Sequence, residues 1–337
     1  MITQVMLIFT AALALALAAT PAARKLAVRT NMLDQPAQRK SHRTPTPLLG
    51  GVAIYAAVLL ALVLFGDKFY VHQVVGIIIG ATFISFLGLW DDRMPLPAWG
   101  KLLGQAIPAL ILVLTGVRVS IFPWEMVNVV VTIVWVLFIT NAVNFLDNMD
   151  GLSAGVAGMA SAYFLLLAAL SGQYLVGALA AAMLGACIGF LVYNFNPASI
   201  FMGDTGSLFL GFVLAAIGIK LRFPTNIPAV TWMVPVLVLG VPILDTTLVI
   251  ISRLRRGKNP FTTPGKDHLS HRLVKMGYTR REAVLMLYLL GSIFGMIAVF
   301  TTQASLPEAA VVGLTVTLVG LAIIIYMEKT NPSQLSE

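Results

Sequence analysis

The chain alternates long apolar runs with short polar breaks. The runs are about 15 to 23 residues long, which is the length that an α-helix needs to cross the hydrocarbon core of a membrane. The breaks hold charged residues, prolines and glycines, as connections between membrane helices do. The pattern predicts about 10–11 membrane-spanning helices, at roughly 3–23, 48–65, 73–90, 100–116, 126–146, 152–171, 174–193, 206–220, 229–251, 283–302 and 307–327.

The composition agrees with this pattern. Of the 337 residues, 58% are hydrophobic and 11% are charged, and the mean hydropathy is +0.91. The longest segment outside the apolar runs, 252–282, is too short for a separate soluble domain. We therefore predict an all-α polytopic membrane protein in which residues 1–337 form a single integral membrane domain.

The basic residues predict the orientation of the helices. Nothing basic precedes the first apolar run, and Arg24 and Lys25 follow it, so we expect a retained helix with its N-terminus outside. On this orientation, 18 of the 22 Lys and Arg residues lie on one side, chiefly in the loops 24–47 and 252–282. The positive-inside rule makes this side cytosolic. Its charge suits anionic lipid or phosphorylated substrates, or sets orientation alone, and the absence of a basic groove interleaved with aromatics argues against nucleic acid.

Five carboxylates fall at ends of apolar runs on this same side. Asp91 and Asp92 end the third run, Asp147 and Asp150 end the fifth, and Asp204 begins the eighth. Carboxylates that converge at low dielectric repel one another unless a cation lies between them. Oxygen ligands without cysteine favour Mg²⁺ or Mn²⁺ over zinc, and Mg²⁺ leaves positions open for phosphate oxygens. The pattern therefore predicts a magnesium site and a diphosphate substrate.

Three further features have two interpretations each. The helix start at 203–207 is either a phosphate-binding N-terminus or an ordinary capped helix, and the motif alone favours capping. His268 and His271 share one face at helical spacing, and either form a functional pair or are ordinary surface histidines. Asp245 lies inside the ninth run with Arg253 two turns further along, and we favour an orienting role over direct chemistry.

Together, five motifs resemble the polyprenyl-phosphate N-acetylhexosamine-1-phosphate transferases, in family order and over roughly residues 34 to 280. The resemblance implies transfer of an N-acetylhexosamine 1-phosphate from a UDP-sugar to undecaprenyl phosphate, with release of UMP and a requirement for Mg²⁺. It also implies a bacterial inner (plasma) membrane and an active site at the cytoplasmic face. The motifs are Arg39-Lys-x-His-x-x-Pro-x-Pro-x-x-Gly-Gly51, Asp91-Asp92, Asn141-x-x-Asn-x-x-Asp-x-x-Asp-Gly-Leu152, Phe201-Met-Gly-Asp-x-Gly-Ser-Leu208 and the histidine loop at 266–273.

The resemblance also implies roles at matching positions. Asp91, Asp92 and Asp204 match the catalytic aspartates, and Asp204 and Asp147 match the metal site. Asn194 and Phe201 match positions near the uridine. The implied substrate-binding residues are Lys40, His42, Thr46, Asn144, Asp147, Asp150, Asn194, Phe201, His268, His271 and Arg272.

Two departures from the family pattern bear on these roles. Asn148 stands where relatives often have glycine, so any positive φ there would fall on an asparagine, which tolerates it better than most residues. Ser270 replaces the middle histidine of the loop, which weakens the role of any single histidine. The absence of three consecutive histidines argues against the phospho-MurNAc-pentapeptide transferases. The basic first loop and the Asp-His-x-x-His-Arg loop favour a UDP-GlcNAc donor.

Several alternatives stay open on the sequence. A phospho-MurNAc-pentapeptide transferase is the alternative within the family, and an ion-coupled secondary transporter or a lipid-binding scaffold lies outside it. The transfer can run by direct attack or through an aspartyl phosphate. A homodimer fits the family, although no motif indicates it.

Overall fold

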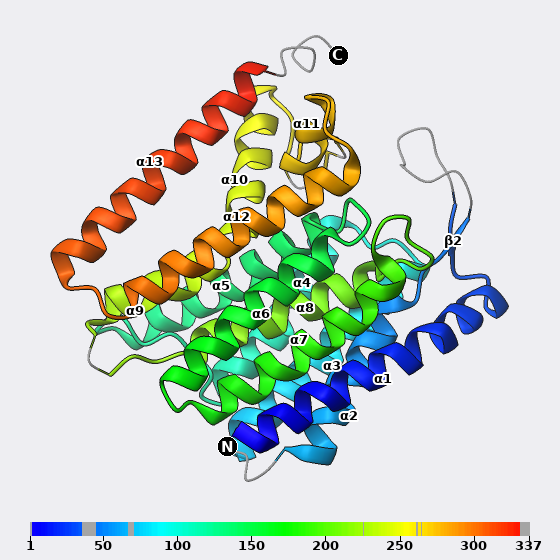
Figure 1. Ribbon diagram of the computed structural model, residues 1–337, viewed down its shortest axis with the longest axis horizontal. Helices are drawn as coiled ribbons and strands as arrows, with labels where there is room; N and C mark the ends of the chain where they lie inside the picture. The colour runs from blue at the N-terminus through cyan, green and yellow to red at the C-terminus, as the bar shows by residue number, and fades with distance from the viewer. Residues whose placement is uncertain are drawn as a thin grey trace. The chain divides into compact units, whose positions relative to one another are not determined.

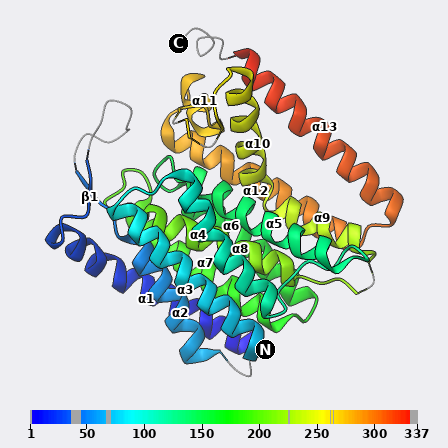
Figure 2. The same ribbon diagram turned by 180° about the vertical axis from the view of Figure 1, so that it is seen from behind.

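The computed structural model describes residues 2–35, 45–66, 71–224, 226–260, 262–263 and 265–330 (Figures 1 and 2). Lys40 and His42 of the first-loop motif lie outside these ranges. The chain divides into two compact units, Met1–Arg222 and Phe223–Glu337, and each unit is described by itself.

Helices make up nearly all of the regular secondary structure among the described residues. Unit 1 contains α1 (Ile2–Arg29), β1 (Leu33–Asp34), β2 (Thr46–Pro47), α2 (Gly50–Phe65), α3 (Val71–Arg93), α4 (Ala98–Leu114), α5 (Glu125–Phe145), α6 (Leu152–Leu170), α7 (Tyr174–Asn194) and α8 (Gly203–Lys220). Unit 2 contains α9 (Pro228–Val238), α10 (Gly240–Arg255), α11 (Leu269–Lys275), α12 (Arg280–Thr301) and α13 (Leu306–Thr330). The two short strands pair antiparallel.

The prediction of an all-α polytopic membrane protein is confirmed. Within the described residues, eight helices are long and apolar enough to cross a membrane, or nine if the bent pair α9–α10 is one span. The remaining predicted runs, 48–65 and 100–116, form the shorter apolar helices α2 and α4. Every apolar run identified in the sequence is therefore helical.

The run 229–251 differs from the straight span that its hydropathy predicts. It breaks at Leu239 into α9 and α10, whose axes differ by 78°. Pro235 and Pro242 flank the break, and neither residue has a backbone N–H for a helical hydrogen bond. A Cβ on Gly240 would lie 2.7 Å from the Phe294 ring of α12, so this glycine lets the bend pack closely. Hydropathy registers the apolar length and not the bend.

Helix α8 is the centre of unit 1. In its membrane window 89% of the residues are buried, and α2, α3, α5 and α6 pack around it. Glycines permit the closest approaches: a Cβ on Gly88 of α3 would lie 2.5 Å from the Asp204 carbonyl, and one on Gly51 of α2 would lie 2.1 Å from the Gly206 nitrogen. The ends of α2 and α3 are thereby held against the first turn of α8.

Helix α13 runs along the outside of unit 2, as both views show. Only 11% of its membrane window is buried, which is typical of a helix whose faces meet lipid. Its C-terminal end is the exception. Glu328 and the Met327 carbonyl there bind Arg272 of α11, so the last turn of α13 is attached to the histidine loop.

Candidate active site

The carboxylates of unit 1 gather around a lysine. Lys101, in the first turn of α4, places its Nζ atom 2.9 Å from Asp91 Oδ2 and also forms an ion pair with Asp204 Oδ2. Asp91 comes from the end of α3 and Asp204 from the first turn of α8, so the lysine joins three helices. Lys101 is the cation that the converging carboxylates require, and it was not among the candidate site residues. A lone cation within the apolar run 100–116 was the available signal, since such a charge needs a partner.

Asn144 completes the surroundings of Asp204. Its Nδ2 donates to Asp204 Oδ1 at 2.7 Å and to Ser207 Oγ at 2.8 Å, while Lys101 Nζ lies 3.4 Å from Asn144 Oδ1. One carboxylate oxygen of Asp204 therefore faces an amide and the other faces an ammonium. This arrangement holds the carboxylate of Asp204 in a fixed orientation.

Asp92 caps helix α8. Its Oδ1 accepts the backbone N–H of Asp204 at 2.7 Å, and its Oδ2 accepts the backbone N–H and the hydroxyl of Thr205 at 3.0 and 2.7 Å. Gly203 has φ +67°, and a Cβ there would lie 2.6 Å from Asp92 Oδ2, so the turn requires glycine. The favoured interpretation of 203–207 as a capped helix start agrees with this geometry, and the cap comes from α3. The catalytic role of Asp92 stays a prediction.

Asp147 is the carboxylate whose charge is least compensated. No hydrogen bond or ion pair reaches its carboxylate from the described residues, although its backbone N–H donates to Asn144. Burial raises the pKa of Asp147 well above its usual range, and the charges of Asp204 and Asp92 raise it further. A carboxylate in this environment attracts a proton or a cation.

A hard divalent cation fits this donor set. Asp147 and Asp204 are two carboxylates coupled by charge, and Mg²⁺ typically takes one or two carboxylates and completes its shell with water and phosphate. Within the described part of the chain, no three His, Cys, Asp or Glu side chains are grouped as ligands of one ion. The two carboxylates suit part of such a shell, and a magnesium site here stays a prediction.

Asp150 and Asn194 hold the loop that leads into α8. Asp150 Oδ2 accepts Asn196 Nδ2 at 2.9 Å and the Ala198 N–H at 3.1 Å. The buried Asn194 accepts the Gly151 N–H at 3.1 Å and donates to the Ile200 carbonyl at 2.9 Å. Both side chains thus tie the turn after α5 to residues 194–200, and contact with a nucleotide stays a prediction for each.

Thr46 and Phe201 lie where the first loop meets this segment. Thr46 is buried in β2, and the Phe201 N–H donates to the Pro47 carbonyl at 2.8 Å. Phe201 is half-buried. Asn148, which stands where relatives often have glycine, does not adopt a positive φ in the turn after α5. The positive φ in this turn falls on Gly151, at 77°, and Asn31 is the one described non-glycine residue with a positive φ.

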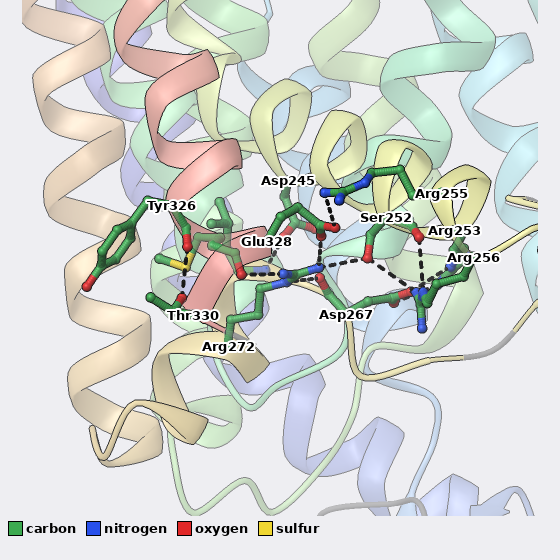
Figure 3. A network of polar contacts seen from close by, with 12 residues as sticks. Asp245, Ser252, Arg253, Arg255, Arg256, Asp267, Arg272, Tyr326, Glu328 and Thr330 are labelled. Carbon is green, nitrogen blue, oxygen red and sulfur yellow. Dashed lines mark hydrogen bonds and ion pairs between the residues drawn. The ribbon is translucent and has the colours of Figure 1, made fainter. Parts of the chain in front are cut away.

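The histidine loop of unit 2 is built on buried arginines. The Asp267 carboxylate accepts Nε and Nη2 of Arg253, both at 3.0 Å, and Nη2 of Arg256 at 2.6 Å (Figure 3). These arginines outweigh the cost of burying the acid and lower the pKa of Asp267 to about 2. The sequence had offered Arg253 as a partner of Asp245, and the structure pairs it with Asp267.

Arg272 is also committed to the protein. Its guanidinium donates to the Asp267 and Met327 carbonyls, to Ser252 Oγ and to Glu328 Oε1, over 2.6 to 2.8 Å. Only 2% of Arg272 is exposed. Figure 3 shows it between Asp267 and Glu328. Its geometry is that of a structural residue, and substrate binding by Arg272 stays a prediction.

His268 and His271 are brought together as their spacing indicated. Their ring centroids are 6.2 Å apart. His268 is buried, and its Nδ1 lies 2.8 Å from Asp245 Oδ2. His271 is half-buried; burial, together with the nearby charges of His268 and Lys266, lowers its pKa to about 4.

Comparison with known proteins places the chain in a family. The model of glycosyl transferase family 4 matches residues 74–222. A probable undecaprenyl-phosphate N-acetylglucosaminyl 1-phosphate transferase of Bacillus subtilis is 35% identical, over 90% of this chain and 86% of its own. The chain belongs to glycosyl transferase family 4. This confirms the resemblance identified from the motifs.

Other relatives represent both branches of the superfamily. A decaprenyl-phosphate N-acetylglucosaminephosphotransferase of Mycolicibacterium smegmatis is 33% identical, over 90% of this chain and 85% of its own. A phospho-N-acetylmuramoyl-pentapeptide-transferase of Bacillus thuringiensis is 28% identical, over 83% of this chain and 91% of its own. The segment that matches glycosyl transferase family 4 includes all five clustered carboxylates and Lys101.

Proposed function

We propose that this protein transfers N-acetylglucosamine 1-phosphate from UDP-N-acetylglucosamine to a polyprenyl phosphate such as undecaprenyl phosphate, with release of UMP. The product is the first lipid-linked intermediate of a cell-envelope polysaccharide. The relatives in the N-acetylglucosamine branch support the transferred group and the lipid acceptor. The observation that carries the proposal is the junction of Lys101 with Asp91 and Asp204, a cation set among carboxylates at helix ends.

The membrane setting follows from the acceptor. Its polyprenyl tail stays in lipid, while its phosphate must meet a water-soluble nucleotide at the interface. We place this meeting at the cytoplasmic face of a bacterial inner membrane, because the basic loops mark that side. A homodimer is part of this proposal because it fits the family, although no motif of the sequence indicates it.

The reaction is a phosphoryl transfer that needs positioning more than a strong base. A phosphate monoester has a second pKa near 6, so much of the acceptor is a dianion at pH 7. One of its oxygens attacks the sugar-linked phosphorus, and the bond from that phosphorus to the oxygen of UMP breaks, with its electron pair leaving on UMP. Orientation and charge neutralisation then supply most of the catalysis.

Lys101 and its acidic partners have distinct tasks in this scheme. Lys101 neutralises phosphate charge, and Asp91 holds the ammonium in place. Asp92 fixes the first turn of α8, which carries Asp204. Asn144 orients Asp204 through a 2.7 Å hydrogen bond. Because the acceptor dianion is itself a nucleophile at pH 7, direct attack by the lipid phosphate is favoured over a route through an aspartyl phosphate.

Asp204 and Asp147 are the residues that would hold Mg²⁺. When bound, the ion supplies neutralisation of the diphosphate charge. The remaining residues are proposed to bind substrate: Lys40, His42 and Thr46 the phosphates, Asn144, Asp147, Asp150, Asn194 and Phe201 the nucleotide, and His268, His271 and Arg272 the sugar and diphosphate.

UMP release by purified protein in detergent tests this function. The assay contains Mg²⁺, undecaprenyl phosphate and UDP-N-acetylglucosamine, and each is omitted in turn. We expect release only when all three are present, and none with Asp204→Asn. Arg118→Gln is the matched control, because Arg118 forms an exposed ion pair with Glu125 outside the cluster. Release with UDP-MurNAc-pentapeptide alone would favour the other branch, and no release with any donor would favour a transporter.

A further inference from the structure

We propose that Asp245 is a positioning residue that fixes the ring of His268 with its proton on Nδ1 and its lone pair on Nε2. The consequence for turnover rests on the proposed function. The assignment of the proton does not, because it follows from contacts within unit 2 alone.

Burying the acidic side chain of Asp245 costs free energy. This acid is 0% exposed and lies on α10, in an apolar run long enough to enter the membrane. Acids in that setting are expensive and persist where specific partners compensate them. The hydroxyl of the neighbouring Thr246 is also buried but has no hydrogen-bond partner among the described residues. Burial in this part of α10 therefore does not by itself provide a polar group with a partner. Asp245 has acquired partners that its neighbour lacks.

The carboxylate of Asp245 has two partners, a backbone amide and a histidine ring nitrogen. Asp245 Oδ1 accepts the backbone N–H of Leu269 at 2.7 Å, and Oδ2 lies 2.8 Å from His268 Nδ1. His268 precedes α11 and makes no side-chain cap of its own, so the carboxylate from α10 satisfies the first N–H of that helix. The backbone bond fixes the orientation of the carboxylate. Oδ2 is thereby directed at one nitrogen of His268.

The two contacts of Asp245 determine which ring nitrogen of His268 carries the proton. A backbone N–H can only donate, so Oδ1 of the Asp245 carboxylate is an acceptor in this arrangement. An ionised Oδ2 can only accept, so Nδ1 of His268 carries a hydrogen. The neutral ring then has its lone pair on Nε2, as in other carboxylate–histidine pairs.

The other charged groups around the histidine loop have partners other than His268. Asp267 pairs with Arg253 and Arg256, and Arg272 pairs with Glu328. Arg255 also pairs with Glu328. Asp245 is therefore the carboxylate that orients His268. The arginine network holds the rest of the loop in place.

Selective ¹⁵N labelling of histidine tests the proton assignment without any substrate. The chain has four histidines, and His268→Gln identifies the signals of the ring concerned. Near pH 8, wild-type protein should show a protonated Nδ1 and an unprotonated Nε2 at His268. A proton on Nε2 in the wild type would overturn the proposal.

Asp245→Asn tests the consequence for turnover. Asparagine keeps the size of the side chain but can present an N–H to His268, which reverses the tautomer. We expect the loss of kcat to be about 10- to 100-fold, the range for groups that orient a ligand histidine from behind, with little change in KM. Thr246→Val, a neighbour of nearly equal volume, should keep wild-type kcat.

Combining Asp245→Asn with His268→Gln separates positioning from general structural damage. If Asp245 acts through His268, the double variant has the same kcat as His268→Gln alone. A further loss of the same 10- to 100-fold size in the double variant would contradict the proposal. If wild-type protein releases no UMP, the proposed function fails, while the ¹⁵N measurement still decides the position of the proton.

Discussion

The carboxylate cluster of unit 1 and the histidine loop of unit 2 use one device for different ends. In both, an acid from one helix caps the start of another: Asp92 of α3 binds the first amides of α8, and Asp245 of α10 binds the first amide of α11. The difference lies in the charge around the cap. In unit 1, Lys101 pairs with Asp91 and Asp204, and Asp147 has only the like charges of other acids around it. In unit 2, Asp245 pairs with a histidine and Asp267 with two arginines.

This difference separates chemistry from support. In unit 1, the Asp147 carboxylate has no hydrogen bond or ion pair from the described residues and lies near other negative charges. Such a carboxylate attracts a cation. In unit 2, the acids around the histidine loop have cationic partners within the protein, so they need no added cation. These pairs hold the loop in a defined conformation. Substitutions in the first region should therefore change turnover. In the second region, substitutions in the arginine network around Asp267 should mainly change stability, whereas Asp245 acts on turnover through His268.

The largest effect is expected at Asp204. Asp204→Asn removes the charge that faces Lys101 and the proposed cation, so kcat should fall by about 1,000-fold or more. The size of the side chain is kept, and the melting temperature should change little. Steady-state UMP release and thermal unfolding of the same preparation provide the two numbers. A loss of folded protein equal to that of Asp267→Asn would remove the contrast between the regions.

Lys101 should come next. Lys101→Met keeps the length of the side chain and removes the ammonium that joins α4 to Asp91 and Asp204, so kcat should fall about 100-fold. Lys101→Arg retains the charge and should recover part of the activity. The comparison is made at saturating substrate. Equal activity of the methionine and arginine variants would mean that the charge of Lys101 has no part in turnover.

Asp267 should reverse the pattern seen in unit 1. Asp267→Asn leaves Arg253 and Arg256 without their carboxylate, and Asp267 is 1% exposed. Breaking such a buried pair costs about 3 to 5 kcal/mol of folding free energy. The melting temperature should drop, while kcat per folded molecule stays near that of the wild type. An unchanged melting temperature would show that the arginines do not support the loop.

The smallest effect is the pH dependence that His271 adds. Its pKa of about 4 lies below the ordinary value of 6.5, so the unfolded chain takes up a proton first and stability falls as pH decreases from 6.5 to 4. Asp267, with a pKa of about 2 against 3.8, keeps its contribution until the pH drops below about 4. His271→Gln should flatten a plot of melting temperature against pH between 6.5 and 4. Parallel curves for the two proteins would refute the assignment.

Much of the candidate site could be read from the chain. The five carboxylates were identified because acids beside apolar runs are conspicuous, and their helix ends were predicted by hydropathy. Lys101 was counted only as an orientation charge, although its place inside the apolar run 100–116 showed that it needs a partner; the run does not show which partner. Its ion pair with Asp204 joins residues 103 positions apart, which sequence spacing does not reveal.

The partners of the buried polar residues show the same limit. Arg253 was the nearest cation to Asp245 along the helix, yet it pairs with Asp267, while Asp245 binds His268, 23 residues away. Asn194 and Arg272 matched substrate-binding positions, and their side chains are engaged in protein contacts. Which atoms meet depends on helix rotation and loop path, and neither is a local property of the chain.

The sequence by itself determined the membrane class, the helical runs, the asymmetry of basic charge and the family. Each of these depends on local composition or on a contiguous motif, which lipid and water act on directly. Only the tertiary structure decided that α9 and α10 bend at Leu239, that Asp92 caps α8, and that Lys101 joins Asp91 to Asp204. These features arise from contacts between distant segments, whose geometry is set when the helices pack.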